Sequence, residues 1–332
     1  MLQPAYKLTI GDGIVDTTDE PQASTLVDLL VSLDMDAPAD GFTLVLGQVG
    51  GLSPARDDEA TIELGYADDG DLAQVMTGTV ASVEPGLTTR RVIGQSAASA
   101  LLFTFVEQTY ESKTAGEIVR DLADQAGVDV ASADDGINFP AYVVDGRRSI
   151  YCHMRDLADL SGFDLYVNFE GELVFEECTG GNSVHIFGYA EQIVELEVLQ
   201  MPPRAEQVEA WGESPGGSES EEAWAWLTKD FGGSKGEAGS GEAKLLLERS
   251  ALRTAEAAQT AAEAAHTRIQ RRSVRGRLMV PGQPQVKLGD AIRLQDVPEE
   301  ALNQTFQVRS VTHRITKLGG FSTTIGFRAI DI

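Results

Sequence analysis

Cysteine and long apolar runs are scarce in this sequence. The two cysteines, Cys152 and Cys178, are too few for a disulfide framework, and we expect both to be buried or chemically idle. No apolar run is long enough to cross a bilayer. The N-terminus also lacks the basic and then apolar pattern of a secretory signal. These absences favour a protein that folds in the cytoplasm, or that leaves the cell inside a larger assembly, without inserting into a membrane.

Positive charge is also scarce. The 332 residues include seven lysines and nineteen arginines against 52 acidic residues, which gives a net charge of −26. Such a chain repels the phosphates of DNA, so we expect no nucleic acid partner. An acidic surface that is poor in lysine is typical of adaptation to high salt and suggests a halophilic host. The alternative is a GC-rich genome combined with an acidic channel wall.

Catalytic and metal-binding patterns are missing as well. The four histidines do not share a metal-ligand spacing, and His313 lies in a strand-like pattern. The glycine-rich stretch at 231–241 does not have the order of a phosphate-binding loop. Four glutamates between 170 and 177 flank a hairpin turn, which indicates a solvated strand face and not a glycosidase pair. We therefore expect a protein that is not an enzyme, with no catalytic residue, no metal and no cofactor.

The most informative pattern that is present is a repeated phrase of ten residues. The sequence RDLADQAGVD at 120–129 returns as RDLADLSGFD at 155–164. In each copy the apolar residues fall on one helical face, and a glycine follows where a left-handed residue ends a helix. Thr114 and Glu117 add a capping box to the first helix. The predicted scaffold-core residues are Leu122, Ala123, Gly127, Leu157, Ala158 and Gly162.

Strand patterns divide the chain into three parts, which together predict an α+β, mostly β, fold. Residues 1–95 contain regularly spaced short strands, typical of a small barrel or sandwich. Residues 96–191 form a mixed α/β segment that holds the repeat. Residues 192–332 return to strands around a predicted mobile loop at 212–241 and an Ala-rich helix at 242–272. The clearest strand candidates are 26–33, 42–46, 60–66, 74–83, 207–211, 274–280, 305–316 and 321–330.

The order of these parts resembles a known family. The segment 110–127 is similar to the central segment of phage late control protein D, and so is 154–175. The stretches GRLMVPGQP, KLGD, FQVRSVTH and GFSTT then follow in the same succession between 276 and 324. From about residue 100 onward the chain resembles the tail hub family, which includes the VgrG proteins of type VI secretion and the central hub of contractile phage baseplates. Residues 1–95 fit that family by fold pattern.

The resemblance implies a structural role in a baseplate. Hubs of this family are homotrimers in which each chain supplies two tail-tube-like β-barrels, so that three chains form a pseudo-sixfold ring. The first barrel would be 5–95, and the second would combine 192–230 with 273–330, with the α/β segment outside. Such a ring joins a hexameric tail tube protein to a threefold spike. Because the sequence stops at Ile332 after the second barrel, we expect the trimeric spike to be a separate protein.

The resemblance also implies further partners and a location. Baseplate wedge proteins and the tape measure protein would contact the hub, which would be assembled in the host cytoplasm and reside in the tail of a virion or injection particle. Two alternatives remain open from the sequence. One is a tail-tube or distal-tail adaptor of different symmetry, and the other is a tail-associated cell-wall hydrolase.

Overall fold

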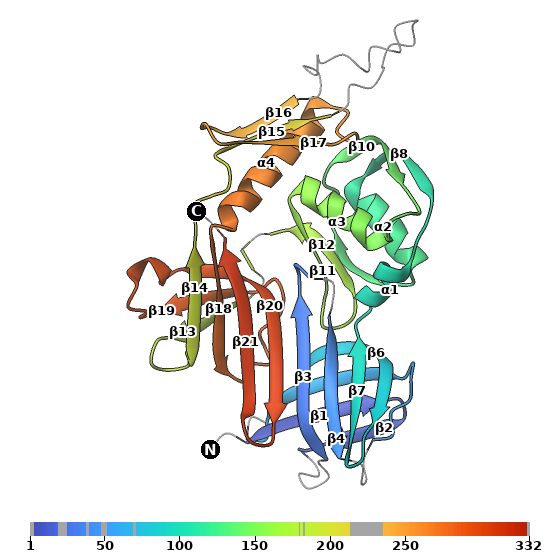
Figure 1. The fold of residues 1–332 in the computed structure, drawn as a ribbon, viewed down its shortest axis with the longest axis vertical. Helices are drawn as coiled ribbons and strands as arrows, with labels where there is room; N and C mark the ends of the chain where they lie inside the picture. The colour runs from blue at the N-terminus through green and yellow to red at the C-terminus, as the bar shows by residue number, and fades with distance from the viewer. Residues whose placement is uncertain are drawn as a thin grey trace, which may run out of the picture.

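The computed structural model describes residues 3–18, 25–37, 40–47, 52–68, 71–178, 180–181, 183–212 and 235–330. These residues form a mostly β fold with a few helices, as the sequence predicts (Figure 1). The molecule is elongated, with one broad sheet in its lower part and the helices gathered above it. In the described ranges no helix is both long and apolar enough to cross a membrane.

One 13-stranded sheet contains two successive groups of strands. The first group is β1 (Pro4–Ile10), β2 (Gly13–Asp16), β3 (Leu26–Asp34), β4 (Gly41–Gly47), β5 (Glu59–Tyr66), β6 (Ala73–Pro85) and β7 (Thr89–Gln95). The second group is β13 (Val184–Gly188), β14 (Glu195–Gln200), β18 (Val274–Pro281), β19 (Ala291–Gln295), β20 (Thr305–Thr316) and β21 (Gly320–Ala329). The groups join where β3 pairs with β20 in antiparallel register, with Asp34 opposite Ser310.

The two groups have the same topology. Neighbours run β3-β4-β7-β6-β5-β1 in the first group and β14-β18-β21-β20-β19-β13 in the second, and both sets follow the same chain order. Each also has a register shift at the same step, between Val80 and Ser82 in β6 and between Val308 and Ser310 in β20. The innermost pairing differs, because β1 is antiparallel to β5 whereas β13 is parallel to β19. We call these groups the first and second halves of the sheet.

The sheet is built on alternating side chains. In β3, Leu29, Val31 and Leu33 are buried while the residues between them are partly exposed. Successive side chains of a strand point to opposite faces, so this pattern puts one apolar face inward. Both halves contribute those faces to a single hydrophobic cluster, which we call the first core.

A second core lies above the sheet in the α/β segment. Its elements are α1 (Ala98–Phe103), β8 (Gln108–Thr114), α2 (Ala115–Gln125), β9 (Val130–Ala133), β10 (Asn138–Val144), α3 (Ile150–Ser161), β11 (Phe163–Val167) and β12 (Leu173–Glu177). The repeated phrase therefore spans the end of α2 and the end of α3, each followed by a strand. The predicted capping box is present, since Thr114 and Glu117 each bind the other's backbone N–H.

Both predicted glycines end their helices in a left-handed conformation. Gly127 has φ +68° and Gly162 has φ +79°, a region that other residues rarely adopt. Behind α2, the Gly127 N–H donates to the Asp124 carbonyl and the Val128 N–H donates to the Ala123 carbonyl. This pair of bonds is the Schellman motif, which satisfies carbonyls that the helix end leaves free.

The segment after β14 differs from the predicted arrangement. β15 (Gln207–Trp211) was expected in the second barrel, but it forms a separate sheet with β16 (Lys235–Gly239) and β17 (Lys244–Glu248). The predicted helix 242–272 begins only at α4 (Ala255–Arg271), where Thr254 caps it. β16 falls inside the predicted loop 212–241, whose residues 213–234 lie outside the described ranges. A short 3₁₀ turn, η4 (Glu300–Leu302), completes the elements.

Packing explains this difference. Alanines along one side of α4 and the buried Val208 and Ala210 of β15 belong to the second core, together with α2 and α3. Likewise β13, expected in the α/β segment, pairs with β19 in the large sheet. The described residues between β14 and β18 are therefore an insertion that packs with the α/β segment and not with the second half of the sheet.

Candidate assembly surfaces

The predicted scaffold-core side chains lie inside the second core. Leu122 and Ala123 on α2, and Leu157 and Ala158 on α3, have no exposed surface. Full burial of a leucine side chain contributes about 1.5–3 kcal/mol to the free energy of unfolding. The repeat thus places matching side chains of two helices in one cluster.

The titratable residues include the side chains that could bind a metal or form a disulfide. Within the described ranges, no group of three or more His, Cys, Asp or Glu side chains could hold a metal ion. Cys152 and Cys178 are half-buried free thiols, and neither is bonded to the other. The His313 ring in β20 is buried beside the Thr323 hydroxyl, at 2.9 Å from Nδ1, and burial lowers the pKa of His313 to about 3. His313 therefore lies in a strand, as its sequence pattern predicts, with its ring packed inside.

A buried ionic cluster joins the two cores. The carboxylate of Asp164 in β11 accepts hydrogen bonds from Arg309 in β20, from Arg328 in β21 at 3.1 Å and from Gln307 at 2.6 Å. Arg309 also donates to Asp36, just beyond β3, at 2.7 Å. Because β3 belongs to the first half and β20 to the second, this cluster binds both halves and the α/β segment together.

The cluster is charged despite its burial. Burial by itself would raise the pKa of Asp164, but the guanidinium groups of Arg309 and Arg328 lower it below the usual aspartate value. The pKa of Asp36 is likewise lowered to about 2, since its hydrogen bond to Arg309 outweighs partial burial. Arg328 has a pKa lowered to about 10 by burial and by the neighbouring Arg309. Removing one partner of a buried ion pair is costly, because the other charge is left buried and uncompensated.

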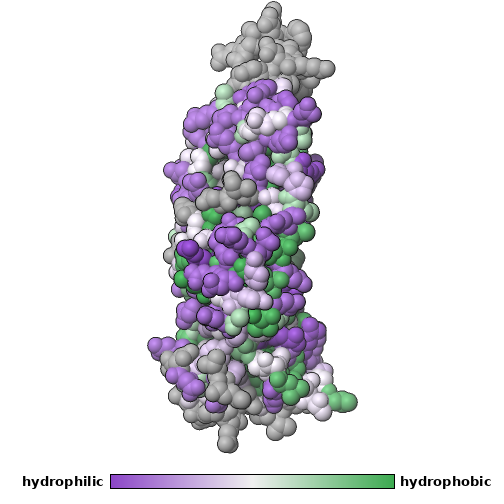
Figure 2. Space-filling view, turned by 90° about the vertical axis from the view of Figure 1, so that its left-hand side faces the viewer, coloured by the Kyte–Doolittle hydropathy of each residue, from purple (hydrophilic) through white to green (hydrophobic). Residues whose placement is uncertain are grey.

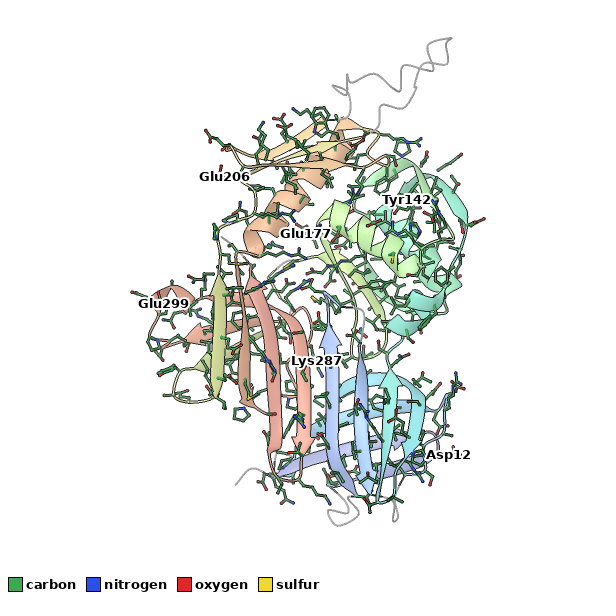
Figure 3. All side chains as sticks on the ribbon, viewed as in Figure 1. Asp12, Tyr142, Glu177, Glu206, Lys287 and Glu299 are labelled. Atoms are coloured by element: carbon green, nitrogen blue, oxygen red, sulfur yellow. The ribbon has the colours of Figure 1, made fainter. Side chains whose placement is uncertain are left out.

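Lys287 makes a second connection between the same three parts. Its ammonium group lies 4.3 Å from the ring centre of Phe169, in the β11–β12 turn, and donates to the Gln74 carbonyl in β6. Burial lowers the pKa of Lys287 to about 8. Figure 3 shows Lys287 at the centre of the molecule and Glu177 above it, between the α/β segment and α4. Glu177 lines a cavity of about 430 Å³ there, together with Arg268 and Arg328.

The face of the sheet opposite the first core carries many small hydroxyl side chains. They are half-buried, and Ser32 and Thr312 lie 3.3 Å apart across the junction of the two halves. We call this surface the polar sheet face, and its hydroxyl residues on five strands are Ser32, Thr43, Ser82, Ser310, Thr312, Ser322 and Thr324. This face belongs to the eight-stranded stretch that runs from β14 to β6.

Exposed apolar side chains are concentrated near one edge of the sheet. Of fourteen large hydrophobic residues that are exposed in the described ranges, six fall between 184 and 201. We call them the β13–β14 apolar surface, and they are Val184, Ile186, Tyr189, Val194, Leu199 and Met201. Figure 2 faces this edge and shows apolar atoms among polar ones at mid-height. Contiguous exposed apolar patches are common at interaction sites, so this surface is a candidate for one.

Two leucines at the lower end of the sheet are fully exposed to solvent. Leu87 lies in the turn between β6 and β7, and Leu318 lies in the turn between β20 and β21. Their exposed fractions are 99% and 102%. These hairpins occupy equivalent places in the two halves, and both turns lie at the lower end in Figure 1. We call this end the lower rim.

Sequence reasoning missed both the ionic cluster and the lower rim. A signal for each was present. Arg309 stands in the middle of a strand-like stretch, and an arginine there needs an acidic partner if it is buried. Leu87 and Leu318 stand in Gly-containing turns, where polar residues are usual. The partner of Arg309 could not be found from the pattern, because Asp164 is 145 positions away.

Comparison with known protein families and with curated protein sequences finds no match. Solved structures do match. A 43 kDa tail protein of prophage MuSo2 from Shewanella oneidensis is 16% identical, with 98% of each chain covered and a TM-score of 0.73. A tail protein from Neisseria meningitidis is 13% identical, with 99% of this chain and 97% of that chain covered and a TM-score of 0.72.

A component of the type VI secretion system of Escherichia coli also shares the fold. It is described as structurally similar to the bacteriophage T4 tail proteins gp27 and gp5. The identity is 10%, with 96% of this chain and 76% of that chain covered and a TM-score of 0.61. The chain therefore has the fold of these phage tail and secretion proteins, and the structural resemblance predicted from the sequence is confirmed.

Proposed function

We propose that this protein is the structural hub of a phage-like tail, and that it acts as a homotrimer joining a hexameric tail tube to a separate spike protein. The observation that carries this proposal is the matching topology of the two halves of the sheet. Each half acts as one tube-like β-barrel. Three chains with two similar halves each supply six similar units, which is the number that a hexameric tube presents.

The two ends of the molecule differ in a way that suits this role. Both halves present a hairpin with an exposed leucine at the lower rim, so the lower rim of a trimer carries six such hairpins. The upper end carries the α/β segment and the insertion with α4, which occur once in each chain. In a trimer the upper end therefore has three copies of these parts and threefold symmetry. On this basis the lower rim faces the tail tube and the upper end faces the spike.

Two other surfaces support a ring of three chains. The polar sheet face lines the channel, where small hydroxyl side chains remain hydrated. The β13–β14 apolar surface lies beside a neighbouring subunit, which covers part of its exposed side chains. Baseplate wedge proteins and the tape measure protein are further proposed partners, from the outside and from the channel. The acidic surface, with a net charge of −26, fits a particle that assembles in high salt.

A non-enzymatic role is part of the proposal. The buried charged groups of the described residues bind one another across element boundaries, as Asp164 and Arg309 do. The relatives in fold are named as tail proteins or as a secretion component. A tail-tube or distal-tail adaptor of sixfold symmetry is the other candidate, since its subunits would share the tube-like fold.

The oligomeric state distinguishes these candidates. We would purify the chain in buffers of low and multimolar salt and measure its mass by light scattering and native mass spectrometry. The hub requires three chains in each particle, and electron microscopy should show a ring with six similar lobes and threefold symmetry. A ring of six identical chains would favour the adaptor, and a stable monomer at high concentration in multimolar salt would overturn the hub. A cell-wall degradation assay on the same sample tests the hydrolase.

A further inference from the structure

The strand pairing that joins the two halves of the sheet can also be formed between two chains. β20 and β3 pair antiparallel, with Ser310 opposite Asp34 and Thr312 opposite Ser32. The Met35 N–H donates to the Arg309 carbonyl at 2.9 Å, so this ladder continues one step past β3. Because the halves share a topology, β6 corresponds to β20 and β14 corresponds to β3. The chain thus contains both partners of an equivalent junction, at the two ends of the eight-stranded stretch from β14 to β6.

The first correspondence is fixed by the register shifts. In the second half the shift lies where Val308 and Ser310 face Phe327 and Gly326. In the first half it lies where Val80 and Ser82 face Gly94 and Ile93. Ser82 is therefore the equivalent of Ser310, and Glu84 is the equivalent of Thr312.

The second correspondence follows from the next strands. Gly41 of β4 lies between Ser32 on one side and Gln95 on the other. Arg275 of β18 lies between Leu199 and Arg328 in the same way. Gln95 and Arg328 are themselves equivalent, because in each half one residue pair separates them from the register shift. That pair is Val80 with Gly94 in the first half and Val308 with Phe327 in the second. Leu199 is therefore the equivalent of Ser32, and Met201 is the equivalent of Asp34.

Both edges are open in the chain. Among the described residues, β14 pairs with β18 on one side only, and residues 81–85 of β6 pair with β7 on one side only. An unpaired edge of this kind is a template for another strand. We propose that 82–85 of one chain pairs antiparallel with 198–201 of a second copy of this chain, with Ser82 opposite Met201 and Glu84 opposite Leu199. The proposal rests on the trimeric hub proposed above and specifies how its subunits meet.

The backbone directions agree with this register. The Met201 N–H donates to the Ser273 carbonyl, so Met201 and Leu199 direct their polar groups toward β18 and Gln200 directs its groups outward. The Gly86 N–H donates to the Thr89 carbonyl, so Val83 directs its groups outward as well. The proposed register sets Val83 opposite Gln200, which places two outward-directed residues together. If the register were shifted by one residue, backbone N–H and C=O groups that face the second chain would lie opposite residues whose groups face their own sheet. Those groups would then form no hydrogen bonds between the chains.

The pairing also covers apolar surface. Leu199 and Met201 are each 45% exposed in the single chain, and both belong to the β13–β14 apolar surface. On the opposite face, Val83 and Val198 already pack against the first core, so the joined edges extend that core from one chain to the next.

Disulfide trapping tests the register. Cys152 and Cys178 are first replaced by serine, and Ser82→Cys is combined with Met201→Cys. Directly opposed residues of a non-hydrogen-bonded antiparallel pair have Cα atoms about 4.5 Å apart, within disulfide range. Mild oxidation should give covalent dimers and trimers on a denaturing gel. The matched control combines Ser82→Cys with Gln200→Cys, which point to opposite faces, and should give none.

A second variant covers the case in which the cysteines disturb folding. Val83→Pro removes the outward N–H of Val83 and leaves its bonds to β7 unchanged, because none come from that N–H. The loss of one hydrogen bond at each interface should raise the dissociation constant of the trimer by about tenfold per interface. The register would be wrong, although the hub proposal would remain, if the trimer formed disulfides only in the control pair. The same holds if Val83→Pro left the dissociation constant of the trimer unchanged. A chain that stays monomeric would overturn the hub itself.

Discussion

Asp164 and Arg309 face each other across the boundary between the two cores. Asp164 belongs to the hairpin that follows the repeated helix α3, and Arg309 belongs to the strand at the junction of the two halves of the sheet. Their ion pair is buried on both sides, with side chains 8% and 6% exposed. The ion pair thereby connects the upper and lower parts of the chain.

The first prediction concerns this pair. Asp164→Asn should lower the free energy of unfolding by about 3–5 kcal/mol, because it leaves Arg328 buried without its ion-pair partner and Arg309 with Asp36 alone. Chemical denaturation followed by circular dichroism measures the effect. The control is Asp28→Asn, which removes the exposed partner of Arg314 and should cost less than about 1 kcal/mol. Equal effects of the two variants would contradict the role given to burial.

The second prediction concerns the repeated helices. Leu157→Asp puts an unpaired charge into the second core and should abolish soluble protein and particle assembly together, at a cost of several kcal/mol. Asp124→Asn is the matched control, since Asp124 is exposed and should tolerate the change. Expression, solubility and particle counts are the measurements. Loss of injection by Asp124→Asn with intact assembly would argue against a purely structural repeat.

Asp159, the equivalent of Asp124 in the second copy, is not a neutral position. In the structure it is half-buried and lies 3.5 Å from Arg155 and 3.3 Å from Arg268, which reaches over from α4. Asp159→Asn should therefore loosen the contact between α3 and α4, and it should destabilise the protein more than Asp124→Asn does.

The third prediction is a pH dependence from Asp40. Burial raises the pKa of this carboxyl from 3.8 to about 7, although the Asp34 N–H donates to it. The folded chain therefore holds a proton between pH 4 and 7 that the unfolded chain has lost. The stability contributed by Asp40 is present below pH 4 and falls as the pH rises, by about 1.4 kcal/mol for each unit. Unfolding of Asp40→Asn at pH 5 and pH 8 should lack this slope, and an unchanged slope would refute the assignment.

The fourth prediction is that salt stabilises the protein. The chain carries 52 acidic residues and a net charge of −26, and self-repulsion weakens a compact state until ions screen it. The melting temperature should rise between dilute buffer and molar salt. A flat or falling curve would point away from a halophilic host.

The fifth prediction concerns the lower rim. Replacing both Leu87 and Leu318 by serine should leave folding and the trimer unchanged, because both side chains are fully exposed. Association with the tail tube protein of the same particle should weaken, which co-sedimentation measures. Val143→Ser, at an exposed apolar position on β10 in the upper part, is the control and should leave tube association intact. Unimpaired association of the double variant would exclude the lower rim as the tube-binding surface.

Strands with clean alternation could be predicted from the sequence, and β20 was predicted with its full extent of 305–316. The repeated helices and their glycines were also predicted, because caps and apolar stripes are local signals. The insertion after β14 was not. Residues 244–248 were read as part of an Ala-rich helix, yet Leu245 and Leu247 pack in the second core as part of a strand beside β15. Such tertiary partners override helix propensity, and local patterns do not reveal them.

The two hairpins of the lower rim are equivalent in place but not in form. The β20–β21 hairpin continues to Thr316 beyond its register shift, whereas the β6–β7 hairpin stops at Pro85. In the proposed ring, long and short hairpins therefore alternate around the axis. Six identical subunits of a tube seated on such a ring would fall into two classes, three above each kind of hairpin. The first layer of the tube would inherit threefold order, and each later layer could regain the sixfold order that identical chains prefer.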